Sequence, residues 1–152
     1  MDGVKRKTAT RRITLDLEFY TPLFQRQILA VGLHGRQFVS GEPIVPVTDQ
    51  FRLGGARNLR GFSEDQFRGS SVAWMNCEYR YWLGRRSRTF IFADYGYYSA
   101  QNTSEKLQEF KLGYGLGFRL ETGLGIMSLD YGLGHGDDLL GGKIHVGLIN
   151  EF

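Results

Sequence analysis

The stretch KLGYGLGFRLE, residues 111–121, decides the fold class of this chain. Leucine, tyrosine and phenylalanine occupy its even-numbered positions, whereas lysine, glycine, arginine and glutamate occupy the odd-numbered ones. This period of two is the pattern of a β-strand with one apolar and one polar face. Because glycine weakens a strand, the three glycines on the polar face are unusual for a surface that meets solvent. They indicate a smooth wall against which another segment packs.

The same alternation recurs along the rest of the chain. It covers residues 13–20, 29–36, 74–81, 91–97, 127–134 and 143–149. Together with 111–121 these segments make about seven strands of roughly ten residues, the length that crosses a bilayer when tilted. No segment has a convincing helical period, and residues 104–110 are expected to form one helical turn at most. The sequence therefore predicts an all-β, antiparallel fold.

The composition agrees with this fold class and argues against several functions. The chain has 152 residues, of which 21 are glycine, and its aromatic share is 14%. A net charge of +3 is too small a surplus to indicate nucleic acid binding. Cys77 is the single cysteine, so neither an internal disulfide nor a multi-cysteine metal site is expected. No apolar run is long enough for a membrane helix, and the basic residues 1–7 lack the apolar core of a signal peptide after them.

Alternation alone leaves the direction of the apolar face open. A soluble, lipocalin-like barrel would turn that face inward, and a membrane barrel would turn it towards lipid. The connections favour the membrane barrel because they alternate in length. Tight turns are expected near Pro22, at residues 84–86 and at 122–123, and longer connections at 37–68, 99–108 and 134–142. Short turns at one end and long loops at the other are typical of an outer-membrane barrel.

The strand count predicts a sheet that is not closed by this chain alone. Outer-membrane barrels normally have an even number of strands, at least eight. An open sheet edge in lipid leaves backbone groups unpaired, at a cost of several kcal/mol each. We therefore expect residues 11–152, after a polar extension over 1–10, to be the C-terminal half of a larger barrel. The alternative is that the sheet closes with a second copy.

The connection at 37–68 contains FRLGGARNLRGF, residues 51–62, and is too long to lack a role. Its arginines could be solvated loop charges, or the loop could fold back onto the polar face. In the second case Arg60 would lose water and would need a carboxylate. Three glycines of the stretch would then permit tight turns and a close approach to the wall: Gly54, Gly55 and Gly61.

Asp94 is the carboxylate that the pattern favours as the partner of Arg60. It lies on the polar face of its strand, flanked by Phe92 and Gly96. Gly96 is expected to leave room for the planar head of the arginine.

Two motifs together resemble the bacterial surface antigen superfamily of outer-membrane proteins. Leu59-Arg60-Gly61-Phe62 matches the family's loop motif of an aliphatic residue, arginine, glycine and an aromatic residue. Phe92-Ala93-Asp94-Tyr95-Gly96 matches its partner-strand motif, aromatic-x-Asp-x-Gly. The resemblance covers residues 11–152 and includes the terminal Phe152, which is typical of barrels read by the assembly machinery. It implies that the arginine of the first motif holds the loop in the barrel by binding the aspartate of the second.

The resemblance also implies a function and partners. The family includes the barrel-assembly insertase BamA, its relative TamA and the transporters of two-partner secretion, all in the bacterial outer membrane. In the insertases the last strand pairs weakly with the first, so that a client strand can add at this seam. Residues 143–152 would be the seam strand here, with Gly147 as a bending point. The implied partners are outer-membrane lipid, client outer-membrane proteins, and the remainder of the barrel or a second copy.

No chemistry of an enzyme is visible in the sequence. The histidines, His34, His135 and His145, are scattered without metal-ligand spacing, and no nucleophile has a nearby base. We therefore expect no catalytic residue, no cofactor and no metal. The alternatives to an insertase are a secretion transporter, a passive pore and, if the apolar faces point inward, a soluble lipocalin-like barrel that binds a ligand.

Overall fold

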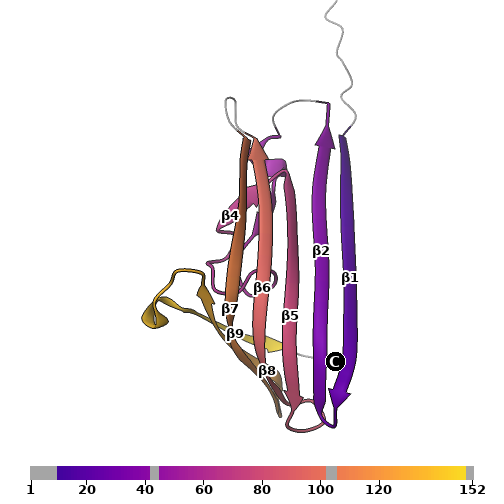
Figure 1. The fold of residues 1–152 in the computed structure, drawn as a ribbon, viewed down its shortest axis with the longest axis vertical. Coiled ribbons are helices and arrows are strands. Elements are labelled where there is room, and N and C mark those ends of the chain that lie inside the picture. Colours follow the sequence, from indigo (N-terminus) through magenta and orange to yellow (C-terminus); the bar gives the residue numbers. More distant parts are fainter. Residues whose placement is uncertain (1–9, 42–44, 102–105, 150–152) are drawn as a thin grey trace, which may run out of the picture.

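A computed structural model describes residues 10–41, 45–101 and 106–149 of the chain. Most of them form one antiparallel sheet of seven strands in the order β1-β2-β5-β6-β7-β8-β9, which is tall and curved (Figure 1). The strands are β1 (Thr10–Phe24), β2 (Gln27–Ser40), β5 (Ser71–Trp82), β6 (Arg88–Gln101), β7 (Lys106–Thr122), β8 (Gly125–Gly134) and β9 (Lys143–Ile149). The predicted all-β antiparallel fold is therefore confirmed.

Most strands are longer than the alternation predicts. β6 continues to Gln101 and β7 begins at Lys106, and Ser99 pairs with Gln108. The connection between these strands is therefore shorter than the one predicted over 99–108. A helical turn is expected over 104–110 at most. This prediction is wrong for residues 106–110, which belong to β7. Pairing with β6 satisfies the backbone of these residues and outweighs their local preference.

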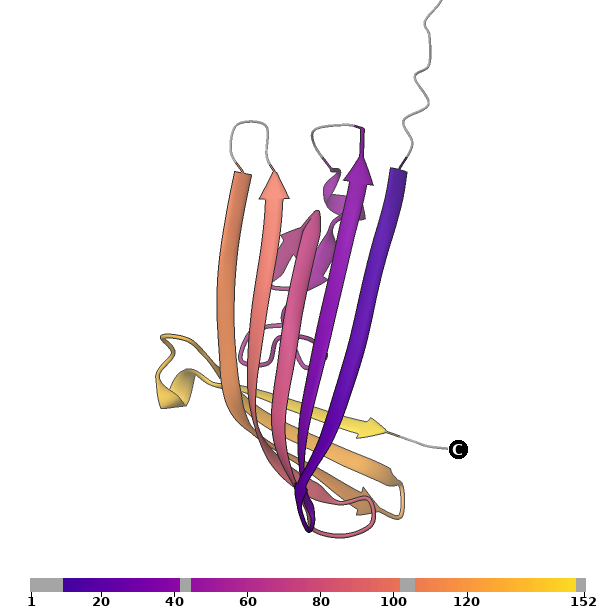
Figure 2. The same cartoon turned by 45° about the vertical axis from the view of Figure 1, so that its right-hand side comes forward.

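The apolar rows of the sheet lie on its open face. Ile91 and Val146 are 63% and 72% exposed, whereas Asp94 on the opposite face is fully buried. The long connection between β2 and β5 packs against this opposite, polar face (Figure 2). The outward direction of the apolar rows agrees with a membrane barrel, whereas the inward direction of a lipocalin-like barrel is not observed.

The long connection has secondary structure of its own. It contains a 3-10 turn, η1 (Val47–Asp49), and a small second sheet in which β3 (Phe51–Leu53) pairs with β4 (Phe67–Gly69). Leu53 and Leu59 are fully buried between this segment and the main sheet, where they pack with Val72 and Tyr98. This apolar cluster fixes the connection on the sheet.

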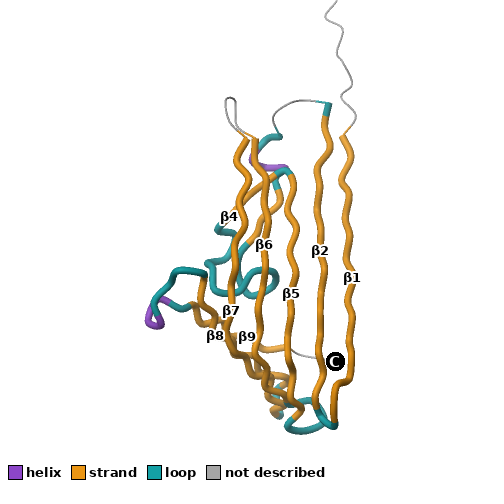
Figure 3. The backbone as a smooth tube through the Cα atoms, in the orientation of Figure 1, coloured by secondary structure: helices purple, strands orange, loops and turns teal. Residues whose placement is uncertain are grey.

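The remaining connections are short or carry one turn. The tight turns after β1, β5 and β7 gather at one end of the sheet (Figure 3). The connection from β8 to β9 includes the 3-10 turn η2 (Leu139–Gly141). Among the described residues, no helix is long and apolar enough to cross a membrane.

β1 and β9 form the two edges of the sheet. In the described part of the chain, β1 pairs with β2 alone and β9 with β8 alone. Each edge strand therefore has one row of backbone groups without a ladder partner in this sheet.

Candidate functional site

The centre of the polar face is a buried ion pair between the loop and the sheet. Arg60 donates from Nε to Asp94 Oδ2 and from Nη2 to Asp94 Oδ1, each at 2.7 Å. Its backbone N–H adds a third bond of 3.0 Å to Oδ2. Arg60 is 4% exposed and Asp94 is 0% exposed. The structure thus brings together the two residues that the motifs single out, in the bidentate geometry that guanidinium and carboxylate favour.

Neighbouring polar side chains complete this network. Glu78 Oε1 accepts a bond of 2.6 Å from Arg60 Nη1, and its other oxygen accepts one of 2.7 Å from Arg80 Nε. Asn76 donates to Asp94 Oδ1 at 2.8 Å and to the carbonyl of Asn58 at 2.9 Å. The two arginines balance the two carboxylates, so burial leaves no uncompensated charge.

An aromatic platform lies under the guanidinium. The guanidinium carbon of Arg60 is 3.7 Å from the ring centroid of Phe92 and 5.7 Å from that of Phe90. Such a contact attracts the cation to the ring face. Burial by itself lowers the pKa of Arg60, but the hydrogen bonds and charges of Asp94 and then of Glu78 raise it above its ordinary value. Arg60 therefore keeps its charge in this site.

The expected role of Gly96 is wrong. A β-carbon at this position would lie 2.9 Å from Leu59 Cδ2 and 3.1 Å from Leu53 Cδ2. The glycine therefore leaves room for the two buried leucines of the loop. The arginine head lies on Phe92 instead, because its bonds to Asp94 direct it there.

The glycines of the loop and of the sheet allow the two backbones to approach each other closely. Gly54, Gly55 and Gly61 have φ angles of 120°, 100° and 93°, which favour glycine at each turn. A β-carbon on Gly61 would lie 2.5 Å from the carbonyl carbon of Leu133 on β8. Phe62, the last residue of the loop motif, packs edge-on against Phe67 with ring centroids 5.2 Å apart.

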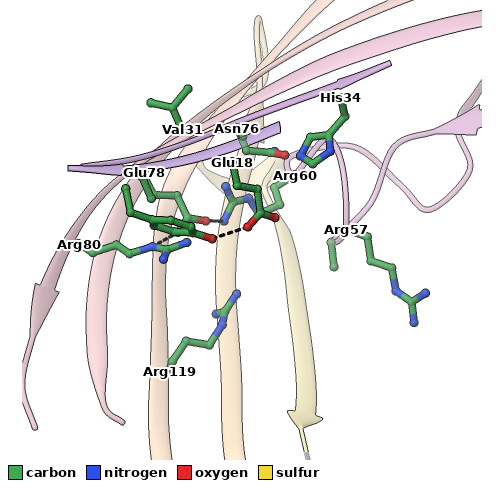
Figure 4. A pocket seen from close by; sticks show the side chains of 13 residues that line it. Glu18, Val31, His34, Arg57, Arg60, Asn76, Glu78, Arg80 and Arg119 are labelled. Atoms are coloured by element: carbon green, nitrogen blue, oxygen red, sulfur yellow. Dashed lines mark hydrogen bonds and ion pairs between the residues drawn. The ribbon is translucent and has the colours of Figure 1, made fainter. Parts of the chain in front are cut away.

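A second buried ion pair joins two strands below the loop. Arg119 of β7 donates from Nη2 to Asp130 Oδ2 on β8 at 2.9 Å, and Asp130 is 3% exposed. Figure 4 shows Arg119 and Arg80 facing a polar pocket of ≈ 240 Å³ between the sheet and the loop. Asn76, Glu78 and Asp130 occupy polar positions in the alternating segments 74–81 and 127–134, but the sequence alone gives none of them a partner.

The other candidate residues lie apart from this network. Gly147 lies in β9 opposite Ser128 of β8, and the terminal Phe152 lies outside the described residues. In the described part of the chain, no group of three or more histidine, cysteine, aspartate or glutamate side chains could hold a metal ion. The geometry of the site is that of an anchor between a loop and a sheet.

A sheet with an apolar outer face, tied through a buried arginine to a loop on its polar face, agrees with part of an outer-membrane β-barrel. The sequence profile of the Omp85 superfamily domain matches residues 5–152, and the chain belongs to this superfamily. The resemblance to the surface antigen family is thereby confirmed. Members of the superfamily are outer-membrane proteins of protein insertion and secretion, which supports a membrane location for this chain. No curated protein matches the chain.

Proposed function

We propose that this protein inserts and assembles other proteins in the bacterial outer membrane, as the BamA- and TamA-like members of its superfamily do. Its apolar face would lie in outer-membrane lipid, and its partners would be the strands of client proteins. The action is mechanical and needs no catalytic residue or cofactor. The observation that carries this proposal is the position of β9 at an edge of the sheet, next to the anchored loop.

The edge of β9 suits the addition of a foreign strand. β9 has seven residues, Lys143–Ile149, and pairs with β8 on one side. A free strand edge offers backbone donors and acceptors to an extended segment, which is the basis of β-augmentation. Addition of a client strand at this edge would leave the ladder between β9 and β8 intact.

The loop reaches the strands that lead to this edge. Its contacts run across five consecutive strands, at Asn76 of β5, Asp94 of β6, Gly113 of β7, Leu133 of β8 and His145 of β9. The last contact joins Glu64 of the loop to His145 Nδ1 at 4.0 Å. A loop fixed at Arg60 therefore supports β8 and β9 from the polar side and holds the edge in position.

Cysteine crosslinking to a stalled client strand tests the proposal. Ile144→Cys places a thiol on β9, and Cys77→Ser removes the native one. In cells that make the full-length protein, we expect Ile144→Cys to form a disulfide with a cysteine in the terminal strand of a stalled outer-membrane protein. The matched control is Leu116→Cys in β7, which is exposed on the same face but has a strand on either side.

The control also separates the alternatives. Equal crosslinking at positions 116 and 144, or none at position 144, contradicts an insertase that works at the β9 edge. If the protein is a secretion transporter, deletion of its gene would instead remove a secreted partner protein from the medium. A passive pore would conduct ions, and its deletion would leave the assembly of outer-membrane proteins unchanged.

The unpaired edges also imply a partner for the sheet itself. The free sides of β1 and β9 would each cost several kcal/mol per unpaired backbone group in lipid. We propose that the remainder of a barrel or a second copy covers them whenever no client is bound.

A further inference from the structure

The open face of the sheet carries a groove that the anchored loop does not explain. It crosses β1, β2, β5, β6 and β7, which lie side by side in Figure 1. One part of ≈ 620 Å³ is apolar and is lined by Leu33, Met75, Tyr95 and Phe110 among others. The next part of ≈ 500 Å³ is mixed, because polar side chains line it together with apolar ones. The two are continuous, because both are lined by Leu15, Ala73, Tyr97 and Gln108.

Small residues in register create the floor of the groove. Gly35 of β2 lies opposite Ala73 of β5, and Leu15 of β1 lies beside Gly35. On the other side, Tyr97 of β6 lies opposite Ala73 and forms a wall with Phe110 of β7, whose ring centroid is 5.0 Å away. A two-residue floor between larger side chains gives a channel with apolar walls.

The mixed part of the groove carries hydrogen-bonding groups and a positive charge. Gln37, Ser71, Ser99 and Gln108 form one row across β2, β5, β6 and β7. Lys106, which is exposed at the start of β7, lines the same part. Among the described residues that line the groove there is no aspartate or glutamate, and the guanidinium of Arg36 is bound to Asp16 at 2.8 Å. The charge of this end therefore favours an anion.

We propose that this groove binds an anionic membrane lipid. One acyl chain would lie between Leu15 and Phe110, and the phosphate of the headgroup would meet Lys106 and the row of amides and hydroxyls. Lysine binds phosphate as a point charge, and amide and hydroxyl donors add hydrogen bonds. The inference rests on the apolar face lying in lipid, as the proposed function requires, but it does not depend on the insertion of client proteins.

Native mass spectrometry of the purified full-length protein tests the site. The protein is released from detergent with equal amounts of phosphatidylglycerol and phosphatidylcholine of the same acyl chains. We expect about fivefold more phosphatidylglycerol than phosphatidylcholine on the wild type, because one lysine near a headgroup contributes about 1 kcal/mol. Lys106→Gln should remove this preference. Lys143→Gln, which removes an exposed lysine at the start of β9, is the matched control and should keep it.

A second pair of variants tests the acyl channel. Ala73→Leu should fill the floor and lower the retention of both lipids, whereas Ala93→Leu, on the same face but outside the groove, should not. If Ala73→Leu fails to fold, Gly35→Val replaces it, since a β-carbon there would make an ordinary 3.8 Å contact with Leu15 Cβ.

Two results would overturn the lipid site. One is equal retention of both lipids by the wild type and all variants. The other is a second protein chain bound in place of lipid, since that would make the groove a contact between copies. Neither result bears on crosslinking at β9, so a failure here remains distinct from a failure of the proposed function.

Discussion

Gly113 of β7 lies directly beneath the backbone carbonyl of Arg60, so closely that a β-carbon at position 113 would overlap the carbonyl oxygen. The wall glycine and the anchoring arginine therefore belong to one contact. Gly132 of β8 is in the same situation, because its β-carbon would lie 2.6 Å from the backbone nitrogen of Gly61. The loop approaches the sheet backbone to backbone, which only glycine on the sheet permits.

Gly113→Ala should therefore displace the loop. The methyl group would meet backbone atoms, which cannot rotate away, and overpacking of this kind costs about 1–3 kcal/mol. We expect a lower urea concentration at the midpoint of unfolding. The folded fraction is measured from the difference in gel mobility between folded and heat-denatured protein. Gly123→Ala is the control, because nothing lies within 4 Å of a β-carbon at Gly123. Equal midpoints for the two variants would contradict the contact.

The ion pair of Arg60 and Asp94 should show strong coupling in a double-mutant cycle. Arg60→Ala and Asp94→Ala each leave a buried charge without its partner, at a cost of about 3–5 kcal/mol. The double variant should cost less than the sum, because residues in direct contact couple by about 0.5–3 kcal/mol. The measurement is the same urea titration. Strict additivity of the two losses would show that the pair does not act as one unit.

Arg60→Lys separates geometry from charge at this anchor. A lysine keeps the positive charge but cannot make the two parallel bonds to the Asp94 carboxylate, nor stack flat on Phe92. We expect a loss of stability close to that of Arg60→Ala. A variant as stable as the wild type would mean that charge alone holds the loop.

Substitution of Gly96 tests whether this glycine makes room for the two leucines of the loop or, as the sequence suggested, for the arginine head. Gly96→Ala should cost about 1 kcal/mol, because its methyl group meets the movable ends of two leucines and not a rigid backbone. Leu59→Ala should relieve this cost in the double variant, whereas Arg60→Lys should not. Urea midpoints of the three single and two double variants check the prediction. Relief by Arg60→Lys and not by Leu59→Ala would mean that Gly96 makes room for the arginine head.

The polarity of each face could be read from the sequence, whereas the register could not. Alternation in residues 111–121 and the glycines among them determine which face is enclosed, and the structure agrees. The Asn76 amide lies beside Asp94 because the two residues are opposite each other in the β5–β6 ladder. A shift of two residues would preserve the same alternation and remove this contact, so the sequence alone could not assign Asn76 a partner.

The packing of the loop was also beyond the sequence. Charge reasoning and the two motifs indicated that Arg60 needs Asp94, since a buried guanidinium requires a carboxylate. They did not indicate that Leu53 and Leu59 fill the space above Gly96, because that depends on how β3 and β4 pair within the loop. The roles of Gly147 and Phe152 at the seam stay predictions.

The two buried ion pairs should have different effects on the loop when they are broken. Arg60 joins the loop to β6, whereas Arg119 and Asp130 join β7 to β8. Asp130→Asn leaves Arg119 without its carboxylate and should lower the urea midpoint, as Arg60→Ala does.

Limited trypsin digestion of the folded protein should separate these two variants. Arg60→Ala should speed cleavage after Arg57, an exposed residue of the loop, because the anchor three residues away is gone. Asp130→Asn should leave that rate near the wild-type value, since the bonds of Arg60 to Asp94 and Glu78 remain. Equal acceleration in both variants would mean that the loop is held by the stability of the whole sheet and not by its own arginine.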